Sequence, residues 1–584
     1  MTLTDELSDI VGQAFEAEGL SKAAGAVRFS DRPDLAQFQC NGALAAAKEK
    51  KAPPRAIAEV VVARLMDDPR LRDVAIAGPG FINFSLIDAE LGRRVEAAST
   101  NATLGGWRKA PERIVVDFGG PNIAKPLHVG HLRSAIIGES LKRILRAAGD
   151  DVVGDIHLGD WGLQMGQLIS ELEARQPGLP YFRPGDGPFP QDPPIALADL
   201  EEMYPAASAA CKEDPARADL ARKATKALQD GRPGYRALWR HFVSLSVAAL
   251  KKDYDDLGVS FDLWKGEADV DPLISGMIAD LEAKGLVELS DGARIIRVAE
   301  ESDKKEVPPI ILVNSEGAVG YHATDIATII DRVQTNAPDR IFYVVDGRQR
   351  LHFEQVFRAS GRAGYFPLER LEHLWFGTMN GADGKPFKTR AGGVLKLRDL
   401  IDQVEERALA RLKENGLAEG YAESEIADIA HKVGVAALKF ADLANPRTTD
   451  YAFDLDRFMA FEGKTGPYLL YAAVRIRSVL AKGAAASAAP GAVEIAEAEE
   501  RQLALSVLAF ADMMRLAYEK RMPHHLCEHA FNLAQAFSKF YAACRIVDEP
   551  DAAKRSSRLA LAAAAGKQIE FVLDLLGIAV PQRM

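Results

Sequence analysis

The sequence of 584 residues predicts a multidomain α/β protein. We expect a parallel sheet in its middle part, a small α+β domain before it and an all-α region after it. Three observations support this fold class. The chain is too long for one hydrophobic core, because single cores stop growing beyond roughly 250–300 residues. A strand–turn–helix–strand pattern begins at residue 113, and the pattern is almost wholly helical after residue 400.

The N-terminal hundred residues alternate helix-like and strand-like segments. Segment 53–67, PPRAIAEVVVARLMD, has apolar residues at helical spacing and starts with proline, which the first turn of a helix tolerates. Segment 74–86, VAIAGPGFINFSL, predicts two short strands about a Gly-Pro-Gly turn. Segment 103–112 is typical of a linker, so we place a first domain at residues 1–108.

A βαβ unit begins at RIVVDF (113–118), a short apolar strand. The turn GGP ends this strand, and a long amphipathic helix follows, with Gly149 as its expected C-cap. DVVGDIHL (151–158) is the next predicted strand. This order predicts a doubly wound, Rossmann-type parallel sheet.

The alternation lapses over residues 170–310, which are first rich in proline and glycine and then charged and helical. It resumes with four segments that predict further strands of the sheet: IILVN (310–314), VGYHATDIA (319–327), RIFYVVD (340–346) and HLWFGTMN (373–380). We therefore place the sheet domain at 109–400, with an insertion at about 170–310. Residues 401–584 form the predicted all-α C-terminal bundle.

Composition restricts the class of protein. No apolar run approaches the roughly 18 residues that cross a bilayer, and the acidic, amphipathic N-terminus is unlike a targeting peptide. The four cysteines form no C-x-x-C motif, which argues against a disulfide framework and fits a reducing compartment. We expect a cytoplasmic protein without a membrane or DNA partner. The net charge of −11 argues mildly against nucleic acid in general, although local patches can differ.

The motif PNIAKPLHVGH (121–131) lies between the first predicted strand and its helix. The start of a helix presents unpaired N–H groups and the positive end of the dipole, which favour phosphate. Gly130 lets a bulky ligand approach the backbone. His128 and His131 can hydrogen-bond phosphate oxygens as charge develops, and Lys125 adds a mobile positive charge. The motif therefore predicts a nucleotide site.

The histidine pair has two alternative interpretations besides a nucleotide site. A zinc site needs further ligands, and no nearby Cys or His supplies one. A structural pair at a helix start is less favoured here, because the pair follows a strand and a glycine break. A second cluster, MPHHLCEHAF (522–531), carries possible zinc ligands in His524, His525, Cys527 and His529. Its spacing fits no recognised pattern, so we predict no zinc and no other bound metal.

The stretch FGGPNIAKPLHVGHLRSAIIGESL resembles the first signature of the class I aminoacyl-tRNA synthetases. Pro-Asn-x-x-Lys before it and Leu-Arg-Ser after it resemble the arginyl-tRNA synthetases in particular. Further segments resemble that family in family order: AQFQCNGALAAAK, GFINFSL, GDWGLQMG, GYHATDIA, YVVDGRQRLH, DGKPFKTRAGG, KTGPYLLYAAVRIRSV and LLGIAVPQRM. The resemblance covers essentially the whole chain.

The resemblance implies an ATP-dependent ligase that joins L-arginine to its tRNA through an arginyl-adenylate and releases pyrophosphate. The implied partners are ATP with Mg²⁺, L-arginine and the tRNA for arginine, and the implied state is a monomer. The family needs tRNA to activate arginine. No compact Asp/Glu cluster is evident in the sequence, so we expect Mg²⁺ to arrive with the phosphates.

The resemblance also implies the arginine-binding residues: Asp117, Asn122, Tyr321, Asp325 and Gln349. A guanidinium needs carboxylates and flat acceptors, which fits contacts from Asp325 and Tyr321. The α-amino group is assigned to Asp117 and Asn122. Taken without the resemblance, the Tyr–Asp pair could form an ordinary helix-surface hydrogen bond. Lysine would leave the acceptors of such a site unpaired, so we expect no editing activity.

A second loop, GADGKPFKTRAGGVLKL (381–397), stands where class I enzymes carry K-M-S-K-S. Its glycines suit a mobile loop. Lys385, Lys388 and Arg390 could neutralise phosphates, with Thr389 as a hydroxyl donor, and Lys125 is expected to compensate for the altered loop. The residues of the predicted ATP site are thus His128, Gly130, His131, Lys385, Lys388, Thr389 and Arg390. The predicted catalytic residues are His128, His131, Lys125 and Lys388. A basic surface turn is the alternative.

Two regions resemble tRNA-binding parts of the family. In the helical region the candidates are Tyr471, Arg475 and Arg477, which could pair phosphates and stack on bases, although basic helix residues are often merely solvated. In the first domain, Phe81 and Asn83 match positions that stack on and read a tRNA base. Two other functions stay open at this point: another nucleotidyltransferase, and an inactive paralogue that binds tRNA. The helical C-terminal region argues against the first, and the intact histidines argue against the second.

Overall fold

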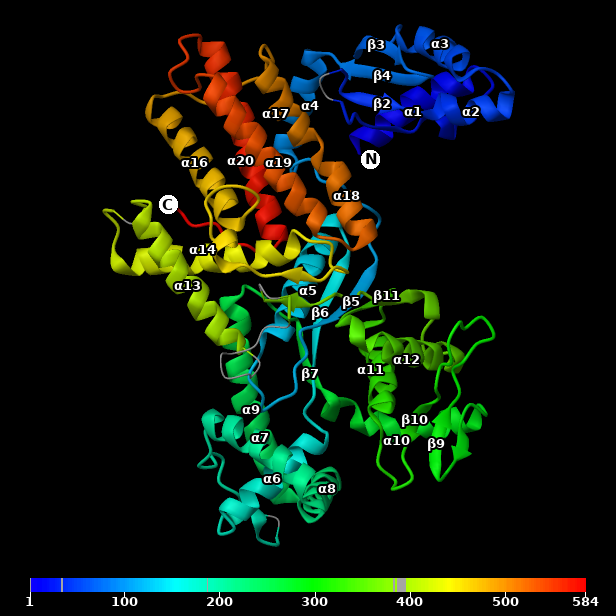
Figure 1. The fold of residues 1–584 in the computed structure, drawn as a ribbon, viewed down its shortest axis with the longest axis vertical. Helices are drawn as coiled ribbons and strands as arrows, with labels where there is room; N and C mark the ends of the chain where they lie inside the picture. The colour runs from blue at the N-terminus through cyan, green and yellow to red at the C-terminus, as the bar shows by residue number, and fades with distance from the viewer. Residues whose placement is uncertain (1, 33–34, 186, 382–383, 386–394, 418) are drawn as a thin grey trace. The chain divides into compact units, whose positions relative to one another are not determined.

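The computed structural model describes residues 2–584 except 33–34, 186, 382–383, 386–394 and 418. The chain divides into two compact units, drawn together in Figure 1. We call Ala110–Gly416 with Val433–Met459 the sheet unit, and Met1–Lys109 with Leu417–Lys432 and Ala460–Met584 the helical unit. Each unit is described separately.

A five-stranded sheet forms the centre of the sheet unit, and all its neighbouring strands are parallel (Figure 1). The order is β12-β11-β5-β6-β7. The strands are β5 (Arg113–Phe118), β6 (Asp151–Leu158), β7 (Leu263–Gly266), β11 (Arg340–Val344) and β12 (Leu371–His373). Helix α5 (Val129–Ala148) connects β5 to β6, as the sequence predicts. The order reverses between β5 and β11, and such a switch point is where doubly wound sheets bind ligands.

A group of helices and a second sheet complete the region between β6 and β11. The helices are α6 (Leu163–Arg175), η2 (Pro180–Phe182), α7 (Leu197–Glu213), α8 (Pro215–Gln229), α9 (Pro233–Asp256), α10 (Glu267–Ala283) and α11 (Tyr321–Asn336). The antiparallel sheet has the order β10-β9-β8, with β8 (Glu288–Ser290), β9 (Ala293–Ile296) and β10 (Ile310–Val313). Strand β7 lies inside residues 170–310, so the parallel sheet takes one strand from that segment.

Three strand predictions are wrong. The segment HLWFGTMN (373–380) is not one strand of the parallel sheet: only its first residue, His373, lies in β12, and its last two form β13 (Met379–Asn380), which pairs with residues 451–452 in a separate two-stranded sheet. The segment IILVN forms β10 of the antiparallel sheet, because its side chains alternate between buried and exposed, as in a sheet covered on one face. The fully buried apolar runs of β5 and β11 instead suit a sheet covered on both faces. The segment VGYHATDIA lies mostly in helix α11, which begins at Tyr321. Strand β7 was missed because it is a short edge strand with little apolar character.

The remaining elements of the sheet unit follow β11. They are η3 (Gly347–Gln349), α12 (Arg350–Ala363), η4 (Leu368–Arg370), the short parallel pair of β13 (Met379–Asn380) with β14 (Tyr451–Ala452), α13 (Leu397–Glu414) and α15 (Leu455–Phe458). Helix α14 (Glu423–Leu443) begins in the helical unit and ends in this one. Its last turns hold α5 through a buried ion pair of 2.8 Å between Arg133 and Asp442.

The helical unit contains a small α+β domain and a helical bundle, which confirms the predicted fold class. The small domain has an antiparallel sheet of order β1-β2-β4-β3, covered by helices around one core. Its elements are α1 (Leu3–Glu16), η1 (Lys22–Gly25), β1 (Val27–Phe29), β2 (Phe38–Cys40), α2 (Gly42–Lys50), α3 (Pro54–Leu65), β3 (Leu71–Ala77), β4 (Phe81–Leu86) and α4 (Asp88–Thr100). The bundle comprises α16 (Gly466–Ala485), α17 (Ala498–Leu508), α18 (Phe510–Lys520), α19 (His524–Ala543) and α20 (Ala552–Leu575).

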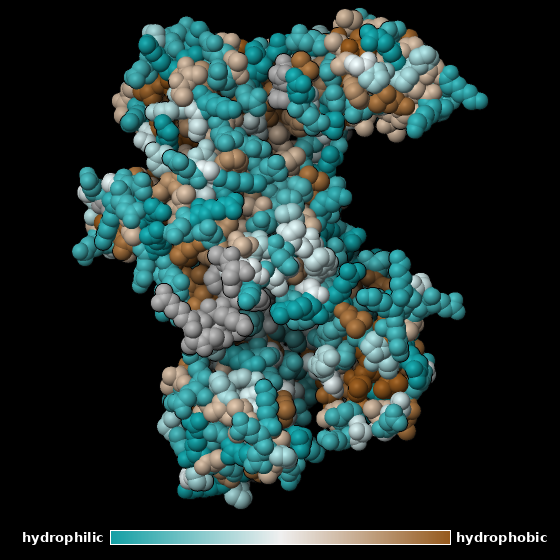
Figure 2. Space-filling model, viewed as in Figure 1, coloured by the Kyte–Doolittle hydropathy of each residue, from teal (hydrophilic) through white to brown (hydrophobic). Residues whose placement is uncertain are grey.

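Apolar side chains reach the surface in a few places. In Figure 2 brown atoms lie over the antiparallel sheet and α10, where Leu289, Ile311 and Val319 are exposed. Single exposed apolar residues are ordinary in soluble folds and need no special role. In the described part of the chain, no helix combines the length and the apolar character that a membrane span requires.

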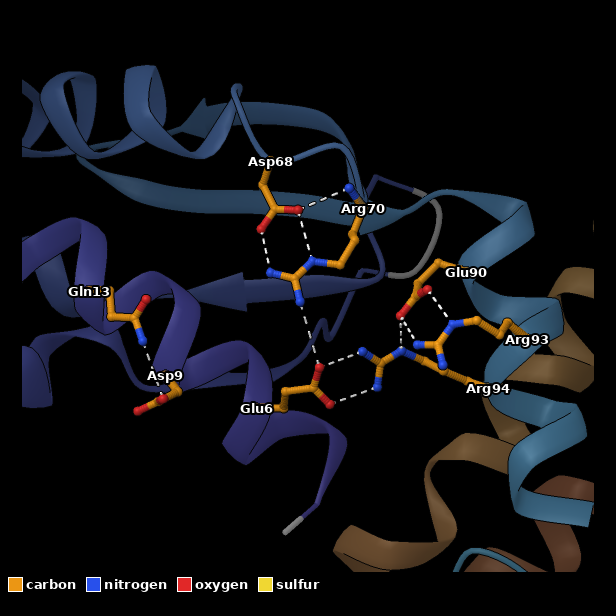
Figure 3. A network of polar contacts seen from close by, with 8 residues as sticks. All are labelled: Glu6, Asp9, Gln13, Asp68, Arg70, Glu90, Arg93 and Arg94. Atoms are coloured by element: carbon orange, nitrogen blue, oxygen red, sulfur yellow. Dashed lines mark hydrogen bonds and ion pairs between the residues drawn. The ribbon is translucent and has the colours of Figure 1, made fainter. Parts of the chain in front are cut away.

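An ion-pair network ties α1 to α4 in the small domain (Figure 3). Arg94 donates two hydrogen bonds to the Glu6 carboxylate, at 2.9 and 2.7 Å, and a third to Glu90 at 2.6 Å. Arg93 also binds Glu90, and Arg70 lies 3.9 Å from Glu6. The Arg94 side chain is only 13% exposed, whereas that of Arg93 is 64% exposed. Arg94 is therefore the residue through which the two helices are joined.

Arg94→Ala is expected to lower the stability of the small domain by about 1–3 kcal/mol, because it removes the one partly buried donor that Glu6 and Glu90 share and leaves Glu6 with only the more distant Arg70. Arg93→Ala is the matched control, and it should change stability by less than about 0.5 kcal/mol. Amide hydrogen exchange in α1 and α4, with thermal unfolding, measures both effects. Equal effects of the two substitutions would contradict the assignment.

Candidate active site

The switch point of the parallel sheet is closed by Ser134 of α5. Its hydroxyl accepts a hydrogen bond from the Gly119 N–H at the end of β5 (2.8 Å) and donates one to the Val344 carbonyl at the end of β11 (2.6 Å). The start of α5 therefore lies directly at the carboxyl ends of the two strands where the order reverses. This crevice is the expected ligand site of such a sheet.

The two histidines of the HVGH motif cap α5. His128 is the N-cap residue, and its Nδ1 accepts a hydrogen bond from the Gly130 N–H at 3.0 Å. The Nδ1 of His131 accepts one from the His128 N–H at 3.2 Å, and the two rings stack at 3.8 Å between centroids. Because both Nδ1 atoms are acceptors, each neutral ring carries its proton on Nε2. Each Nε2–H is thus a donor suited to a phosphate oxygen.

The environment keeps both rings neutral in the free protein. Burial, with smaller effects of His128 and Lys125, lowers the pKa of His131 to about 3. Burial and the positive charge of Lys125 also lower the pKa of His128. The pair therefore offers neutral donors at pH 7, and a bound polyanion would favour their protonation. The helix start and Lys125 supply the positive potential.

The segment that follows the second loop pairs with the HVGH segment. The Val129 N–H donates to the Leu395 carbonyl (3.1 Å), and the Leu397 N–H donates to the Leu127 carbonyl (2.8 Å). His128 and Lys396 form an antiparallel bridge between these bonds. The C-terminal end of the loop is thus fixed beside the histidines.

Of the predicted loop residues, Lys388, Thr389 and Arg390 lie outside the described residues. Lys385 is described and exposed, and its carbonyl accepts a hydrogen bond from the Gly381 N–H at 2.7 Å. Lys385 thus lies shortly after the end of β13.

The PNIAK turn before the histidines is held by two neighbours. Asn122 forms a parallel bridge with Gly159, and a Cβ at Gly159 would lie 2.0 Å from the Asn122 side-chain oxygen. A side chain at Gly159 would therefore displace the Asn122 amide, which gives the glycine that begins GDWGLQMG a structural reason. Ala124 has a left-handed φ of 59°, and its N–H donates to Ser246 of α9 at 2.9 Å. The Asn122 side chain is exposed at the crevice.

Tyr321 and Asp325 lie on one face of α11, as their spacing predicts. Tyr321 is 64% exposed and stacks on His322 at 4.2 Å between centroids. Asp325 is partly buried, and its carboxylate lies 2.6 Å from Nε2 of His352 on α12. His352 was not among the predicted residues, although it follows Gln349 by three positions. Gln349 itself is exposed at the end of η3.

Asp117 is not a free carboxylate. Arg332 of α11 binds it at 2.5 Å and binds Asp155 of β6 at 2.8 Å. Arg332 and Asp155 are each 1% exposed, whereas Asp117 is 14% exposed. Burial raises the pKa of Asp155, and the two carboxylates hold the pKa of Arg332 well above its usual range against the effect of burial. Asp117 thus faces the crevice with one oxygen bound. Arg332 was not predicted from the sequence because it lies 215 residues away from Asp117.

The predicted tRNA-binding residues lie in the helical unit. Asn83 of β4 is buried, and its side-chain oxygen accepts a hydrogen bond from Gln39 at 3.0 Å, while Phe81 is half-buried. On α16, Tyr471 is exposed and the Arg475 guanidinium lies 4.2 Å from the centre of the Tyr541 ring. Arg477 binds Glu570 at 2.5 Å and the Pro581 carbonyl at 2.8 Å, so it also anchors the C-terminal segment.

The second histidine cluster is packed into the bundle. His529 is 3% exposed, its Nε2 lies 3.1 Å from Oε1 of Gln568, and its ring stacks on Phe510 at 5.3 Å. Cys527 is also buried. In the described ranges, no three His, Cys, Asp or Glu side chains come together as possible metal ligands. These contacts give His529 a packing role.

Replacing His529 by Gln is expected to weaken the dependence of stability on acid pH. Burial lowers the pKa of His529 to about 4, against an ordinary value of 6.5. Below pH 6.5 the unfolded chain binds a proton at this histidine that the folded chain does not bind. The contribution of neutral His529 to the free energy of unfolding is therefore complete above pH 6.5 and is lost towards pH 4. When the pH falls from 7 to 5, the free energy of unfolding of the wild type should decrease by about 2 kcal/mol more than that of the variant. Unfolding at both pH values measures this, and equal losses would contradict it.

Comparison with known proteins agrees with the geometry. A family model described as "tRNA synthetases class I (R), catalytic domain" matches residues 96–455. A protein of Hyphomonas neptunium named "Arginine--tRNA ligase" is 55% identical, with both chains fully covered. The chain belongs to the arginyl-tRNA synthetase family. Two further family models match: "Arginyl tRNA synthetase N terminal domain" over residues 1–86, and "DALR anticodon binding domain" over residues 469–584.

Other members of the family agree in sequence and in fold. A Maricaulis maris protein named "Arginine--tRNA ligase" is 52% identical over the whole of both chains. The crystal structure of arginyl-tRNA synthetase from Plasmodium falciparum matches with a TM-score of 0.81 at 23% identity, and that from Thermus thermophilus with 0.80 at 24%, with full coverage of both chains in each case. At such identities these structures support the fold, and they confirm the multidomain α/β class.

Proposed function

We propose that the chain ligates L-arginine to its tRNA, forming arginyl-adenylate from arginine and ATP, releasing pyrophosphate, and then transferring the arginyl group to tRNA. The observation that carries this proposal is the pairing of two sites at one switch point. Neutral histidines cap the start of α5 on one side, and the carboxylate of Asp325 lies on α11 on the other. The first suits a triphosphate and the second suits a guanidinium.

ATP is the substrate that the start of α5 would hold. The Nε2–H groups of His128 and His131 would donate to phosphate oxygens, and the exposed Gly130 leaves the backbone accessible. Lys125, together with Lys385, Lys388, Thr389 and Arg390 of the second loop, would neutralise the charge that develops on the pyrophosphate. Lys388 and Lys125 are the cations we assign to catalysis. Mg²⁺ would come with ATP, since the described residues offer no ligand cluster for it.

Arginine is the amino acid that the α11 side of the crevice would select. The Asp325 carboxylate can accept two guanidinium N–H groups in parallel, with Tyr321 and Gln349 beside it. His352 would orient that carboxylate through its 2.6 Å contact. Asn122 and the oxygen of Asp117 that faces the crevice would receive the α-amino group.

The tRNA is proposed to contact the helical unit through Phe81, Asn83, Tyr471, Arg475 and Arg477. The matches to N-terminal and anticodon-binding family models support this assignment. We propose a division of the chain into a tRNA-binding domain at 1–108, a catalytic domain at 109–400 with an insertion at about 170–310, and a helical anticodon-binding part at 401–584. We further propose that the enzyme acts as a monomer in the cytoplasm.

Transfer of labelled arginine to tRNA tests the proposed function. With ATP and Mg²⁺ present, the label should become acid-precipitable with the tRNA for arginine and not without tRNA. Adenylation of a different small molecule would instead favour another nucleotidyltransferase. Binding of tRNA without any charging would favour an inactive paralogue.

A further inference from the structure

Helix α7 contacts both lysines that flank the phosphate site. The Lys125 ammonium lies 4.4 Å from the centre of the Tyr204 ring. One turn earlier on the same helix, the Glu201 carboxylate binds Lys396 at 2.8 Å. Residues three apart lie on one helix face, so α7 presents Tyr204 and Glu201 to the site together. No role was predicted for this helix from the sequence.

The two lysines stand on paired backbone segments. Leu127 and Val129 exchange hydrogen bonds with Leu397 and Leu395, which brings the backbones of the HVGH segment and the loop end together. Helix α7 therefore contacts the first signature and the end of the second loop at once. A cavity of about 310 Å³ lies alongside, lined by residues of α7, of α9 and of both segments.

Three of the cations that line this cavity are held in two different ways. Lys396 pairs with Glu201, and Arg398 pairs with Asp253 at 2.8 Å, so a carboxylate compensates each of them. Lys125 contacts an aromatic ring, and within the described ranges it has no ion pair. A ring attracts an ammonium through its quadrupole and carries no net charge. Lys125 is thus localised while its positive charge stays available to an anion.

We infer that Tyr204 is a positioning residue for adenylate formation, holding Lys125 beside the phosphates without neutralising it. The inference rests on the proposed function, in which Lys125 assists the release of pyrophosphate. A lysine on its flexible four-carbon stem loses much rotamer freedom when it engages a phosphate. Placing it beforehand reduces that cost. A carboxylate at position 204 would also place it, but would compete with the phosphates for the charge.

The test is tRNA-dependent pyrophosphate exchange by the full-length protein and four variants. Tyr204→Leu should lower kcat/KM for ATP by about twofold to fivefold, the range that a partly exposed cation–π contact supports. Tyr204→Phe keeps the ring and should match the wild type. Tyr204→Glu should be at least as impaired as Tyr204→Leu. The KM for arginine should stay constant in all three. Glu202→Ala, which removes an α7 carboxylate paired with Arg175, is the control and should be fully active.

A double-mutant cycle separates positioning from helix packing. In a Lys125→Ala background, Tyr204→Leu should have no further effect, since the group that it positions is gone. An effect that persists in that background, or a Tyr204→Leu variant as active as the wild type, would overturn the inference. Absence of exchange by the wild type would instead overturn the proposed function. Thermal unfolding of each variant identifies any that fails to fold. If Tyr204→Leu fails to fold, the exchange activities of Tyr204→Phe and Tyr204→Glu test the inference in its place.

Discussion

Asp325→Asn is expected to lower kcat/KM for arginine by about 10³-fold in tRNA-dependent pyrophosphate exchange. Losing one partner of a hydrogen-bonded charge pair costs about 2–5 kcal/mol, because the other charge is left uncompensated. Asparagine keeps the size of the side chain and one acceptor, so the loss reports on charge and bidentate geometry. The KM for ATP should change little, since the phosphate site lies at α5.

The control for this substitution is Asp331→Asn on the same helix. The Asp331 carboxylate binds Lys265 at 2.6 Å, and we assign it no substrate contact. Its variant should retain full exchange activity. If Asp325→Asn kept the wild-type kcat/KM for arginine, the guanidinium site would have to lie elsewhere. The same assay with lysine should show little exchange by the wild type, and a tRNA mischarged with lysine should not be hydrolysed.

Arg332→Leu is expected to destabilise the sheet unit by about 3–5 kcal/mol, the cost of breaking a buried ion pair by removing one partner. The substitution leaves Asp155 buried without its cation, and frees Asp117 from its 2.5 Å contact. Thermal or urea unfolding measures the loss. Among folded molecules, the KM for arginine should rise, because Asp117 loses the group that orients it.

Arg340→Ala is the control for Arg332→Leu. Arg340 begins β11, its side chain is 36% exposed, and it lies 3.4 Å from Glu112. Exposed ion pairs contribute at most about 1 kcal/mol, so this variant should unfold almost as the wild type does. A wild-type unfolding midpoint for Arg332→Leu would mean that the Asp117–Arg332–Asp155 network does not stabilise the sheet.

Local patterns in the sequence predicted those parts of the fold that local interactions determine. The order β5, α5, β6 follows from a buried strand, a glycine turn and an amphipathic helix, whereas the capping of α5 by its two histidines was the reading that the sequence favoured less. Membership of a sheet was less predictable, since pairing is decided by distant partners. Strand β10 joins an antiparallel sheet with β9, and the short strand β7 joins the edge of the parallel sheet.

The difference between local patterns and distant partners also applies to the residues of the candidate active site. Asp325 and Tyr321 were assigned by spacing and by resemblance, and both lie on one helix, four residues apart. Arg332 and Tyr204 were missed, because each meets its partner from an element far away in the sequence: Arg332 and Asp117 are 215 residues apart. Partners of this kind carry no local pattern. His352 lies only 27 residues from Asp325 and ends the segment YVVDGRQRLH, so it was within reach of the sequence but was not assigned a role. The resemblance supplied the substrates, and the structure adds the groups that hold the predicted residues in place.

We propose that one switch point joins an ATP-phosphate site at α5 to a guanidinium site at Asp325. Amino-acid-dependent pyrophosphate exchange tests this proposal most directly, measured with arginine and with lysine, in the presence and absence of tRNA. We expect rapid exchange with arginine only when tRNA is present, and little exchange with lysine under either condition. Exchange with lysine at a rate comparable to arginine, or no exchange with arginine and tRNA together, would contradict it.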